Sequence, residues 1–167
     1  MTLRAASDKV VSRDELTRRL SRPRSDTVVF TNGVFDLMHR GHATYLAAAR
    51  ALGDVLVVGL NTDASTRRLG KGEDRPLVGE ADRAFVLGSL ECVDYVCLFD
   101  EDTPSDLIDA LVPDVLVKGG DYDLTDVVGR ETVEANGGRV ELIPFVEGYS
   151  TTDLLRRIRA HADETST

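Results

Sequence analysis

Hydrophobic positions along the chain alternate between two patterns. Short apolar runs typical of strands buried on both faces of a sheet occur at 27–32, 55–60, 93–98, 114–118 and 139–145. Between them, apolar residues at helical spacing predict helices at 42–52, 63–69, 79–90 and 104–111, with a last helix from about Thr151. The repeated strand–helix–strand units predict an α/β fold, a Rossmann-like, doubly wound, parallel five-stranded sheet.

The domain organisation expected from this pattern is simple. The chain has 167 residues, and no linker, internal repeat or low-complexity segment divides it, so we expect a single domain over 1–167. The spacing from Ser12 to Glu15 is that of a capping box and predicts a short helix within an N-terminal helical extension, 1–26. The tail 162–167 is expected to be frayed.

Charge and cysteine content limit the classes of protein. Acidic residues outnumber basic ones by 29 to 20, for a formal net charge of −9, which argues against nucleic acid or an anionic membrane as the main partner. There is no apolar stretch long enough to span a bilayer and no signal-peptide pattern, so we expect a cytoplasmic location. Cys92 and Cys97 match no metal-ligand spacing and are expected to be small buried hydrophobes.

Polar and small residues follow several of the predicted strands. They lie at 32–36, 61–63 and 118–121, and a further group at 150–152 begins the last helix. Ligands of doubly wound sheets bind beyond the carboxyl ends of the strands, where the strand order reverses. The sequence therefore predicts one pocket that collects all four groups.

The most informative of these positions are two histidines three residues apart, His39 and His42, in a chain with only three histidines. They lie between the first strand and the next helix, where unpaired backbone N–H groups and the helix dipole favour a phosphate. At this spacing both rings can point to one side of the first turn, and Gly41 leaves room for a ligand near the backbone. The alternative is a chance pair on a surface turn, which the preceding strand and following helix disfavour.

The segment GVFDLMHRGH at 33–42 resembles the G-x-F-D-x-x-H-x-G-H motif of the cytidylyltransferase-like nucleotidyltransferases. The similarity is closest to the subgroup that makes ADP-heptose from D-glycero-β-D-manno-heptose 1-phosphate. Strings similar to that subgroup's motifs follow in order: NTDAST, DRP, EDTP, LVKGGDY, NGG and STTDL. The resemblance covers nearly the whole chain, from about Val28 to Ile158.

This resemblance implies transfer of AMP from ATP to a sugar 1-phosphate, with release of pyrophosphate, on a fold of the HxGH nucleotidyltransferase type. Mg²⁺ would accompany ATP and be held mainly by phosphates, with no protein cage for the metal. The catalytic residues it implies are His39, His42 and Lys71, the lysine closing over the triphosphate. The nucleotide- or phosphate-binding residues it implies are Thr31, Asn32, Gly33, Phe35, Gly41, Lys118, Gly119, Ser150, Thr151 and Thr152. The acceptor-binding or supporting residues are Asp36, Asn61, Asp63, Arg83 and Asp121.

Each of these roles has a plainer structural alternative. Lys71 and Lys118 could be solvated loop lysines, although a compact ammonium suits a phosphate contact. Arg83 could form a structural ion pair inside its helix. Ordinary N-capping would explain one hydroxyl of the segment 150–152 but not three in a row. The roles of Asp36 and Asp63, whether toward metal, ribose or the fold, stay open at this point.

Two other functions compete with heptose 1-phosphate adenylylation. One is a cytidylyltransferase acting on glycerol 3-phosphate or another polyol phosphate. Those enzymes carry an arginine where this chain has Phe145, and a GDDW-like segment where it has GGDY, and both differences favour the heptose subgroup. The other is a nucleotide-binding sensor without catalysis, which has no need of the two histidines and Lys71. The resemblance also implies a homodimer and a separate sugar kinase that supplies the acceptor.

Overall fold

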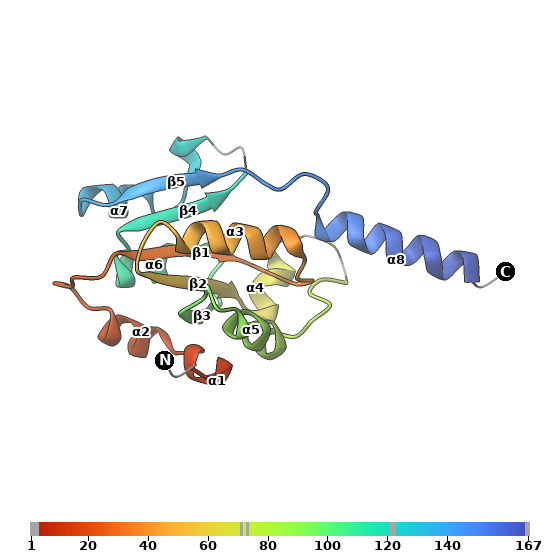
Figure 1. The fold of residues 1–167 in the computed structure, drawn as a ribbon, viewed down its shortest axis with the longest axis horizontal. Coiled ribbons are helices and arrows are strands. Elements are labelled where there is room, and N and C mark those ends of the chain that lie inside the picture. Colours follow the sequence, from red (N-terminus) through yellow and green to blue (C-terminus); the bar gives the residue numbers. More distant parts are fainter. Residues whose placement is uncertain (1–3, 71, 73, 121–122, 166–167) are drawn as a thin grey trace.

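The computed structural model describes residues 4–165 except 71, 73, 121 and 122. It contains one sheet of five parallel strands in the order β3-β2-β1-β4-β5 (Figure 1). The strands are β1 (Val28–Gly33), β2 (Val55–Asn61), β3 (Tyr95–Phe99), β4 (Val115–Gly119) and β5 (Arg139–Ile143). The predicted Rossmann-like, doubly wound, five-stranded parallel sheet is confirmed.

Helices cover both faces of this sheet. Their bounds are α1 (Ala6–Lys9), α2 (Arg13–Arg19), α3 (Arg40–Arg50), α4 (Asp63–Arg68), α5 (Glu80–Ser89), α6 (Ser105–Leu111), the 3₁₀ turn η1 (Leu124–Asp126), α7 (Arg130–Ala135) and α8 (Thr151–Thr165). One buried cluster joins α3 and α5 to the sheet, and a second joins α2, α6 and α7 to its other face. The strand order therefore reverses between β1 and β4, in the middle of the sheet.

The central strands are apolar on both faces because helices cover both. Val28, Val29, Phe30 and Thr31 are all fully buried, and β2 is buried from its second residue to its end. Cys97 lies in one core cluster and Cys92 packs against the other; both are free thiols, and burial raises the pKa of Cys97 to about 11. The two cysteines thus contribute to packing on opposite faces.

Several expected boundaries differ from those observed. The helix expected at 42–52 begins two residues earlier, at Arg40, so His42 lies inside its first turn. The strand expected to reach residue 145 ends at Ile143, because Pro144 has no N–H to continue the ladder. No helix was expected between the last two strands, where α7 makes the crossover.

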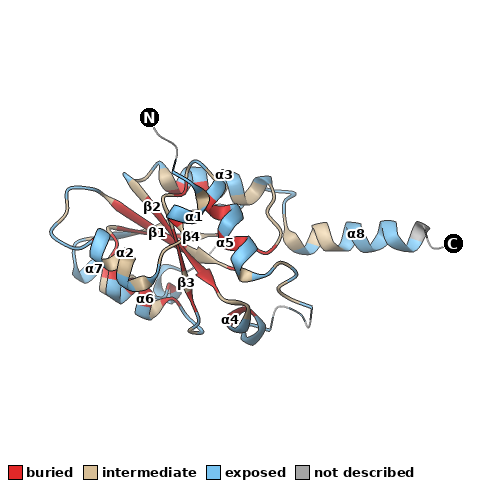
Figure 2. Ribbon diagram, turned by 90° about the horizontal axis from the view of Figure 1, so that it is seen from below, coloured by how far each residue is buried: buried red, intermediate tan, exposed pale blue. Residues whose placement is uncertain are grey.

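The two ends of the chain differ in how they join the sheet. The extension 1–26 holds α1 and α2; α2 is capped by Ser12, whose hydroxyl accepts from the N–H of Glu15, and Val10 forms a bridge with Val96 of β3. The last helix, α8, projects from the body and is mostly exposed (Figure 2). Its described residues extend to Thr165, within the segment 162–167 for which fraying is expected. Only the first turn of α8 therefore lies close to the carboxyl ends of the strands.

Candidate active site

A cavity of about 760 Å³ lies beyond the carboxyl ends of β1, β2 and β4, between the starts of α3 and α8. Parallel pairing brings these strand ends to one edge, with Gly33 opposite Leu60 and Gly119 opposite Ile143. The expected site residues that line this cavity are Asn32, Gly33, Phe35, Asp36, His39, Gly41, His42, Asn61, Lys118, Gly119, Ser150, Thr151 and Thr152. All four polar segments of the sequence thus meet at the switch point of the sheet.

Five expected residues are not in the described wall. Thr31 is buried beneath it, with its Oγ1 2.6 Å from the hydroxyl oxygen of Tyr45. Asp63 and Arg83 form a separate polar network behind the cavity. Lys71 and Asp121 lie outside the described residues.

The two histidines stack on each other at the start of α3. Their ring centroids are 3.9 Å apart with an interplanar angle of 21°, and His39 is the N-cap residue of the helix. Burial lowers the pKa of His42 to about 4, with a further contribution from His39, and burial also lowers the pKa of His39. Both rings are therefore neutral at pH 7. Their Nδ1 atoms are buried and have no hydrogen-bond partner within the described part of the chain.

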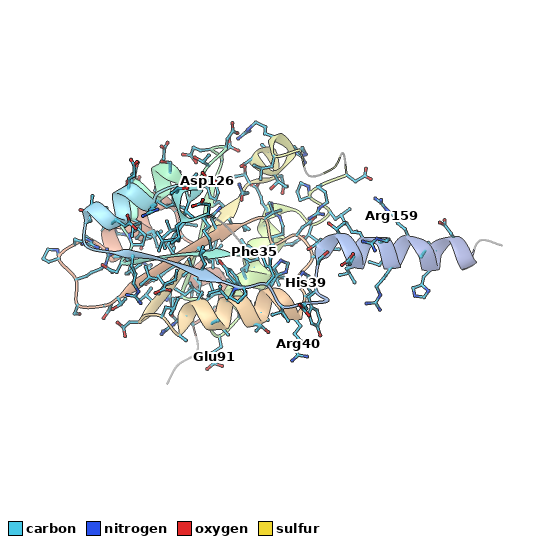
Figure 3. The ribbon with its side chains drawn as sticks, turned by 90° about the horizontal axis from the view of Figure 1, so that it is seen from above. Phe35, His39, Arg40, Glu91, Asp126 and Arg159 are labelled. Carbon is cyan, nitrogen blue, oxygen red and sulfur yellow. The ribbon has the colours of Figure 1, made fainter. Side chains whose placement is uncertain are left out.

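Glycine at position 41 lines the cavity and also affects packing around it. A Cβ there would come within 2.9 Å of the His39 ring and within 2.9 Å of the Cβ of Tyr149. Tyr149, which precedes α8, also lies parallel to His39, with ring centroids 6.2 Å apart. Gly41 thus allows the first turn of α3 to pack closely against the segment that leads into α8 (Figure 3).

Phe35 has a left-handed backbone conformation, with φ of 48°, which is uncommon for a residue with a large side chain. The residue is 93% buried, and its ring packs against Gly33 and meets His42 edge-on with centroids 5.3 Å apart. This turn carries the chain from the end of β1 to His39. It also directs Asp36 away from the histidines and toward the loop that precedes α5.

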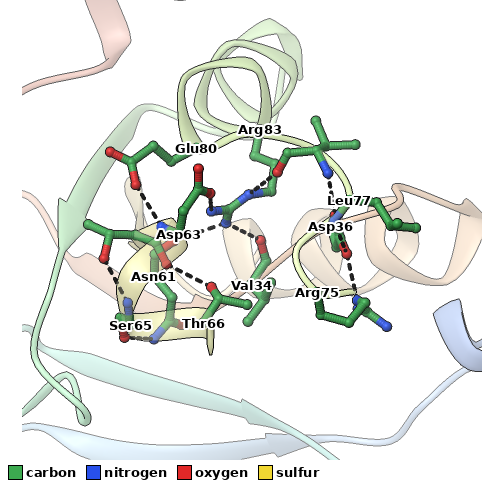
Figure 4. A network of polar contacts seen from close by, with 12 residues as sticks. Val34, Asp36, Asn61, Asp63, Ser65, Thr66, Arg75, Leu77, Glu80 and Arg83 are labelled. Carbon is green, nitrogen blue, oxygen red and sulfur yellow. Dashed lines mark hydrogen bonds and ion pairs between the residues drawn. The ribbon is translucent and has the colours of Figure 1, made fainter. Parts of the chain in front are cut away.

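Asp36 is occupied by contacts with that loop. Its carboxylate accepts from the backbone N–H groups of Leu77 and Val78, at 2.9 Å each, and from Nε of Arg75 at 2.6 Å (Figure 4). Burial raises the pKa of Asp36, but these three donors outweigh burial and leave the pKa below its ordinary value. The carboxylate is thus ionised, and its contacts hold the loop that precedes α5 against the end of β1.

Arg83 holds the strand ends together from behind the cavity. It is 99% buried and donates to the carbonyls of Val34, Asn61 and Val78 and to Oδ1 of Asp63, at 2.7–2.9 Å (Figure 4). All three of its side-chain nitrogens have protein partners, and it does not line the cavity. The structural ion pair considered as an alternative is therefore the arrangement found here.

The opposite wall carries a half-buried lysine and the start of α8. Lys118 donates to Oδ1 of Asn32, and burial lowers the pKa of its ammonium group to about 8. Ser150 caps α8, its hydroxyl accepting from the N–H of Asp153 at 3.0 Å, and Thr151 and Thr152 form the first turn. A helix of this length presents unpaired N–H groups and a positive dipole end to the cavity.

Sequence reasoning missed several lining residues. These are Val34, Tyr45, Leu69, Arg75, Asp102, Phe145, Val146 and Tyr149. Phe145 was noted only as a departure from a related family, yet its exposed ring lies over Gly119 and Gly120. The clearest missed signal is the pair of aromatic residues, Phe145 and Tyr149, in the short segment between β5 and α8.

The described residues contain neither a metal-binding cluster nor a membrane-spanning helix. Among those residues, no group of three or more His, Cys, Asp or Glu side chains could hold a metal ion. Within the same part of the chain, none of the helices has both the length and the apolar character needed to cross a bilayer.

Comparison with known proteins agrees with the site geometry. The family described as "Cytidylyltransferase-like" matches residues 30–157. "Bifunctional protein HldE" of Citrifermentans bemidjiense is 59% identical over 155 residues, which are 92% of this chain and 32% of that protein. HldE of Geobacter sulfurreducens is 62% identical over 138 residues, 82% of this chain and 28% of that protein. The chain thus spans about a third of the length of the curated relatives it matches.

Solved structures show the same architecture. A lipopolysaccharide core biosynthesis protein from Thermoplasma volcanium superposes with a TM-score of 0.62 at 28% identity, covering 75% of this chain and all of that one. A pantothenate synthetase from Thermus thermophilus has a TM-score of 0.57 at 20% identity, covering 83% of this chain and 62% of that one, and shows the fold alone. Together with the paired histidines at the switch point, these matches show that the chain belongs to the cytidylyltransferase-like family.

Proposed function

We propose that this protein transfers AMP from ATP to D-glycero-D-manno-heptose 1-phosphate, giving ADP-heptose and pyrophosphate. One structural observation carries the nucleotidyl transfer: two imidazoles, stacked at the start of α3, share a cavity with the start of α8. The choice of heptose and ATP is supported by the motifs that resemble the ADP-heptose subgroup and by 59% identity to an HldE protein over 92% of the chain.

The proposed reaction is an in-line displacement at the α-phosphorus of ATP. An oxygen of the sugar 1-phosphate forms the new P–O bond, and the bond from the α-phosphorus to the bridging oxygen of the β-phosphate breaks, so pyrophosphate leaves with that electron pair. The nucleophile is already ionised at neutral pH and needs no strong base. Catalysis then consists of positioning the two phosphates and stabilising the charge that develops between them.

In this proposal, three groups of cavity residues have different roles in binding the phosphates. His39 and His42, each neutral and with one N–H to donate, would bind the phosphate that reacts. The hydroxyls and N–H groups of Thr151 and Thr152 at the start of α8 would hold the β- and γ-phosphates. Lys118 would contribute a positive charge opposite the histidines.

Mg²⁺ fits this site as an ion that phosphate oxygens hold. The two acidic residues in the described wall already have cationic partners, Asp36 with Arg75 and Asp102 with Arg68. Bound to the triphosphate, the metal would supply positive charge to the departing pyrophosphate. A homodimer, a separate sugar kinase that supplies the acceptor, and a cytoplasmic location complete the proposal.

Substrate choice tests the proposal directly. We expect ATP with heptose 1-phosphate to give at least about tenfold higher kcat/KM than any other pair, since a site that hydrogen-bonds the hydroxyls of its substrate rejects analogues that lack them. Pyrophosphate release is measured for four nucleoside triphosphates against heptose 1-phosphate, hexose 1-phosphates and glycerol 3-phosphate. Faster turnover with CTP and glycerol 3-phosphate would assign the protein to the polyol phosphate cytidylyltransferases instead.

The low pKa of Lys118 predicts how binding depends on pH. In the free protein the ammonium is protonated below about pH 8 and neutral above it, whereas a bound phosphate favours the charged form. ATP binding at pH 8–9 should therefore be accompanied by proton uptake, and its affinity should fall as the pH rises through this range. Calorimetry in two buffers of different ionisation enthalpy measures the uptake.

The matched variant is Lys118→Met, which removes the titrating group but keeps an unbranched side chain. It should bind ATP more weakly at pH 7 and show no proton uptake at higher pH. The histidines do not interfere, because their pKa values are lowered. Equal proton uptake by the variant and the wild type would remove Lys118 from the phosphate site.

A further inference from the structure

Arg75 differs from the other strongly buried arginines of this chain. Its side chain is 13% exposed, and it lies in the loop between α4 and α5 and lines the cavity. The side chains of Arg24 and Arg83 are 9% and 0% exposed. In both of those residues Nε, Nη1 and Nη2 all donate to protein oxygens.

Arg75 uses only one of its three nitrogens in this way. Its Nε donates to Oδ2 of Asp36 at 2.6 Å, and within the described ranges Nη1 and Nη2 have no hydrogen-bond partner (Figure 4). A structural ion pair of the kind that Arg24 makes with Asp114 would use Nη2 as well. Among the described residues, the Nη1 and Nη2 donors at the outer edge of the Arg75 guanidinium are thus free to meet a ligand in the cavity.

Asp36 fixes the direction of that outer edge. The side chain of Asp36 is fully buried, and its two oxygens also accept from the N–H groups of Leu77 and Val78. Asp36 follows β1 and precedes His39 by three residues, so the same short turn sets the positions of the histidines and of Arg75. A planar guanidinium held at Nε can offer two parallel N–H donors, which match two oxygens of one phosphate.

We propose that Arg75 binds a phosphate group of a substrate through Nη1 and Nη2, with Asp36 acting as its positioning residue. This inference rests on the proposed function in that it takes the cavity for a site of phosphate chemistry. The phosphate belongs either to the nucleoside triphosphate or to the sugar phosphate. Each is an oxyanion with two oxygens available for the fork, and separate titrations distinguish them.

The test measures binding, so it does not depend on turnover. Calorimetry gives Kd for ATP, for heptose 1-phosphate and for inorganic phosphate with the wild type, Arg75→Gln and Arg75→Lys. We expect Arg75→Gln to raise the Kd for one of the two substrates, ATP or heptose 1-phosphate, by about 10- to 100-fold, the range for a lost charge-assisted pair. The Kd for inorganic phosphate should rise by a similar factor. Arg75→Lys keeps the charge but not the fork and should recover only part of the affinity.

Two further variants separate positioning from folding and from net charge. In Asp36→Asn, an amide oxygen still accepts from Leu77 and Val78, but the new NH₂ group faces Nε of Arg75. This variant should lower the melting temperature but keep a cooperative melting transition, and it should weaken the binding of the same ligand as Arg75→Gln does. Arg67→Gln removes an exposed positive charge from neighbouring α4 and should bind all three ligands as the wild type does.

The outcomes are distinct. Unchanged Kd values for all three ligands in Arg75→Gln would overturn the assignment, and so would a loss that Arg75→Lys restores completely. A loss in Arg75→Gln that is accompanied by the disappearance of its cooperative melting transition, with normal binding by Arg75→Lys, would show a structural role only. Failure of the proposed function is recognised separately, as a wild type that binds ATP but does not turn over heptose 1-phosphate.

Discussion

Replacing His42 with alanine is expected to lower kcat by about 10²–10³, the usual effect of removing one positioned donor from a developing negative charge. The ring stacks on His39 and its Nδ1 is buried without a partner among the described residues, so none of those residues depends on it for a hydrogen bond. The fold and the affinity for ATP should therefore change little. Steady-state kinetics, melting temperature and ATP titration measure the three effects separately.

The matched control is His161→Ala, at the third histidine of the chain, which is exposed on α8 far from its first turn. It should keep the kcat of the wild type. A second variant, His42→Asn, retains a hydrogen-bond donor but not the stacked ring. Its kcat should lie between those of His42→Ala and the wild type. If His42→Ala kept more than a tenth of the wild-type kcat, the catalytic assignment of His42 would be wrong.

Replacing Arg83 with methionine should lower the free energy of unfolding by about 3–5 kcal/mol, as expected when one partner of a buried ion pair is removed. Methionine fills similar space, but the carbonyls of Val34, Asn61 and Val78 and the carboxylate of Asp63 all lose their donor. Chemical denaturation with a two-state fit measures the change.

The control for Arg83 is Arg139→Met, which breaks an exposed pair with Glu141 on the edge strand β5. It should lower the free energy of unfolding by less than about 1 kcal/mol, since exposed ion pairs contribute little to stability. Equal losses in the two variants would contradict the role of Arg83 as the group that ties the strand ends together. A normal KM for ATP in the surviving fraction of Arg83→Met would agree with a residue that supports the cavity without touching the substrate.

Most of the fold was predictable because its elements carry local signals. Buried parallel strands produce uninterrupted apolar runs, and Ser12 shows its cap through the spacing to Glu15 alone. The helix α7 was missed because it is only six residues long, with Val133 as its one buried residue, so helical periodicity cannot develop. The boundary at Ile143 depends on Pro144, a signal that was present but outweighed by the apolar run.

The site was predictable to the extent that strand ends converge. Polar residues directly after β1, β2 and β4 had to meet, since parallel strands end at one edge of the sheet. Arg75 could not be placed in this way, because the loop between α4 and α5 that carries it is long and its course depends on tertiary contacts such as that of Asp36 with Leu77. For Asp36 and Arg83, the sequence shows a charged side chain but not its partner. The partner determines whether the side chain is available to a substrate or stabilises the fold.

The left-handed turn at Phe35 has a consequence for evolution and engineering. Such a conformation in a non-glycine residue holds about 1–3 kcal/mol of backbone strain, which packing around the ring must offset. The same turn aims Asp36 at one wall of the cavity and begins the path to His39 at the other. Glycine or asparagine at this position would relieve the backbone strain but would remove the ring that packs against Gly33 and His42, so a change made to relax the turn would also loosen the order of the site.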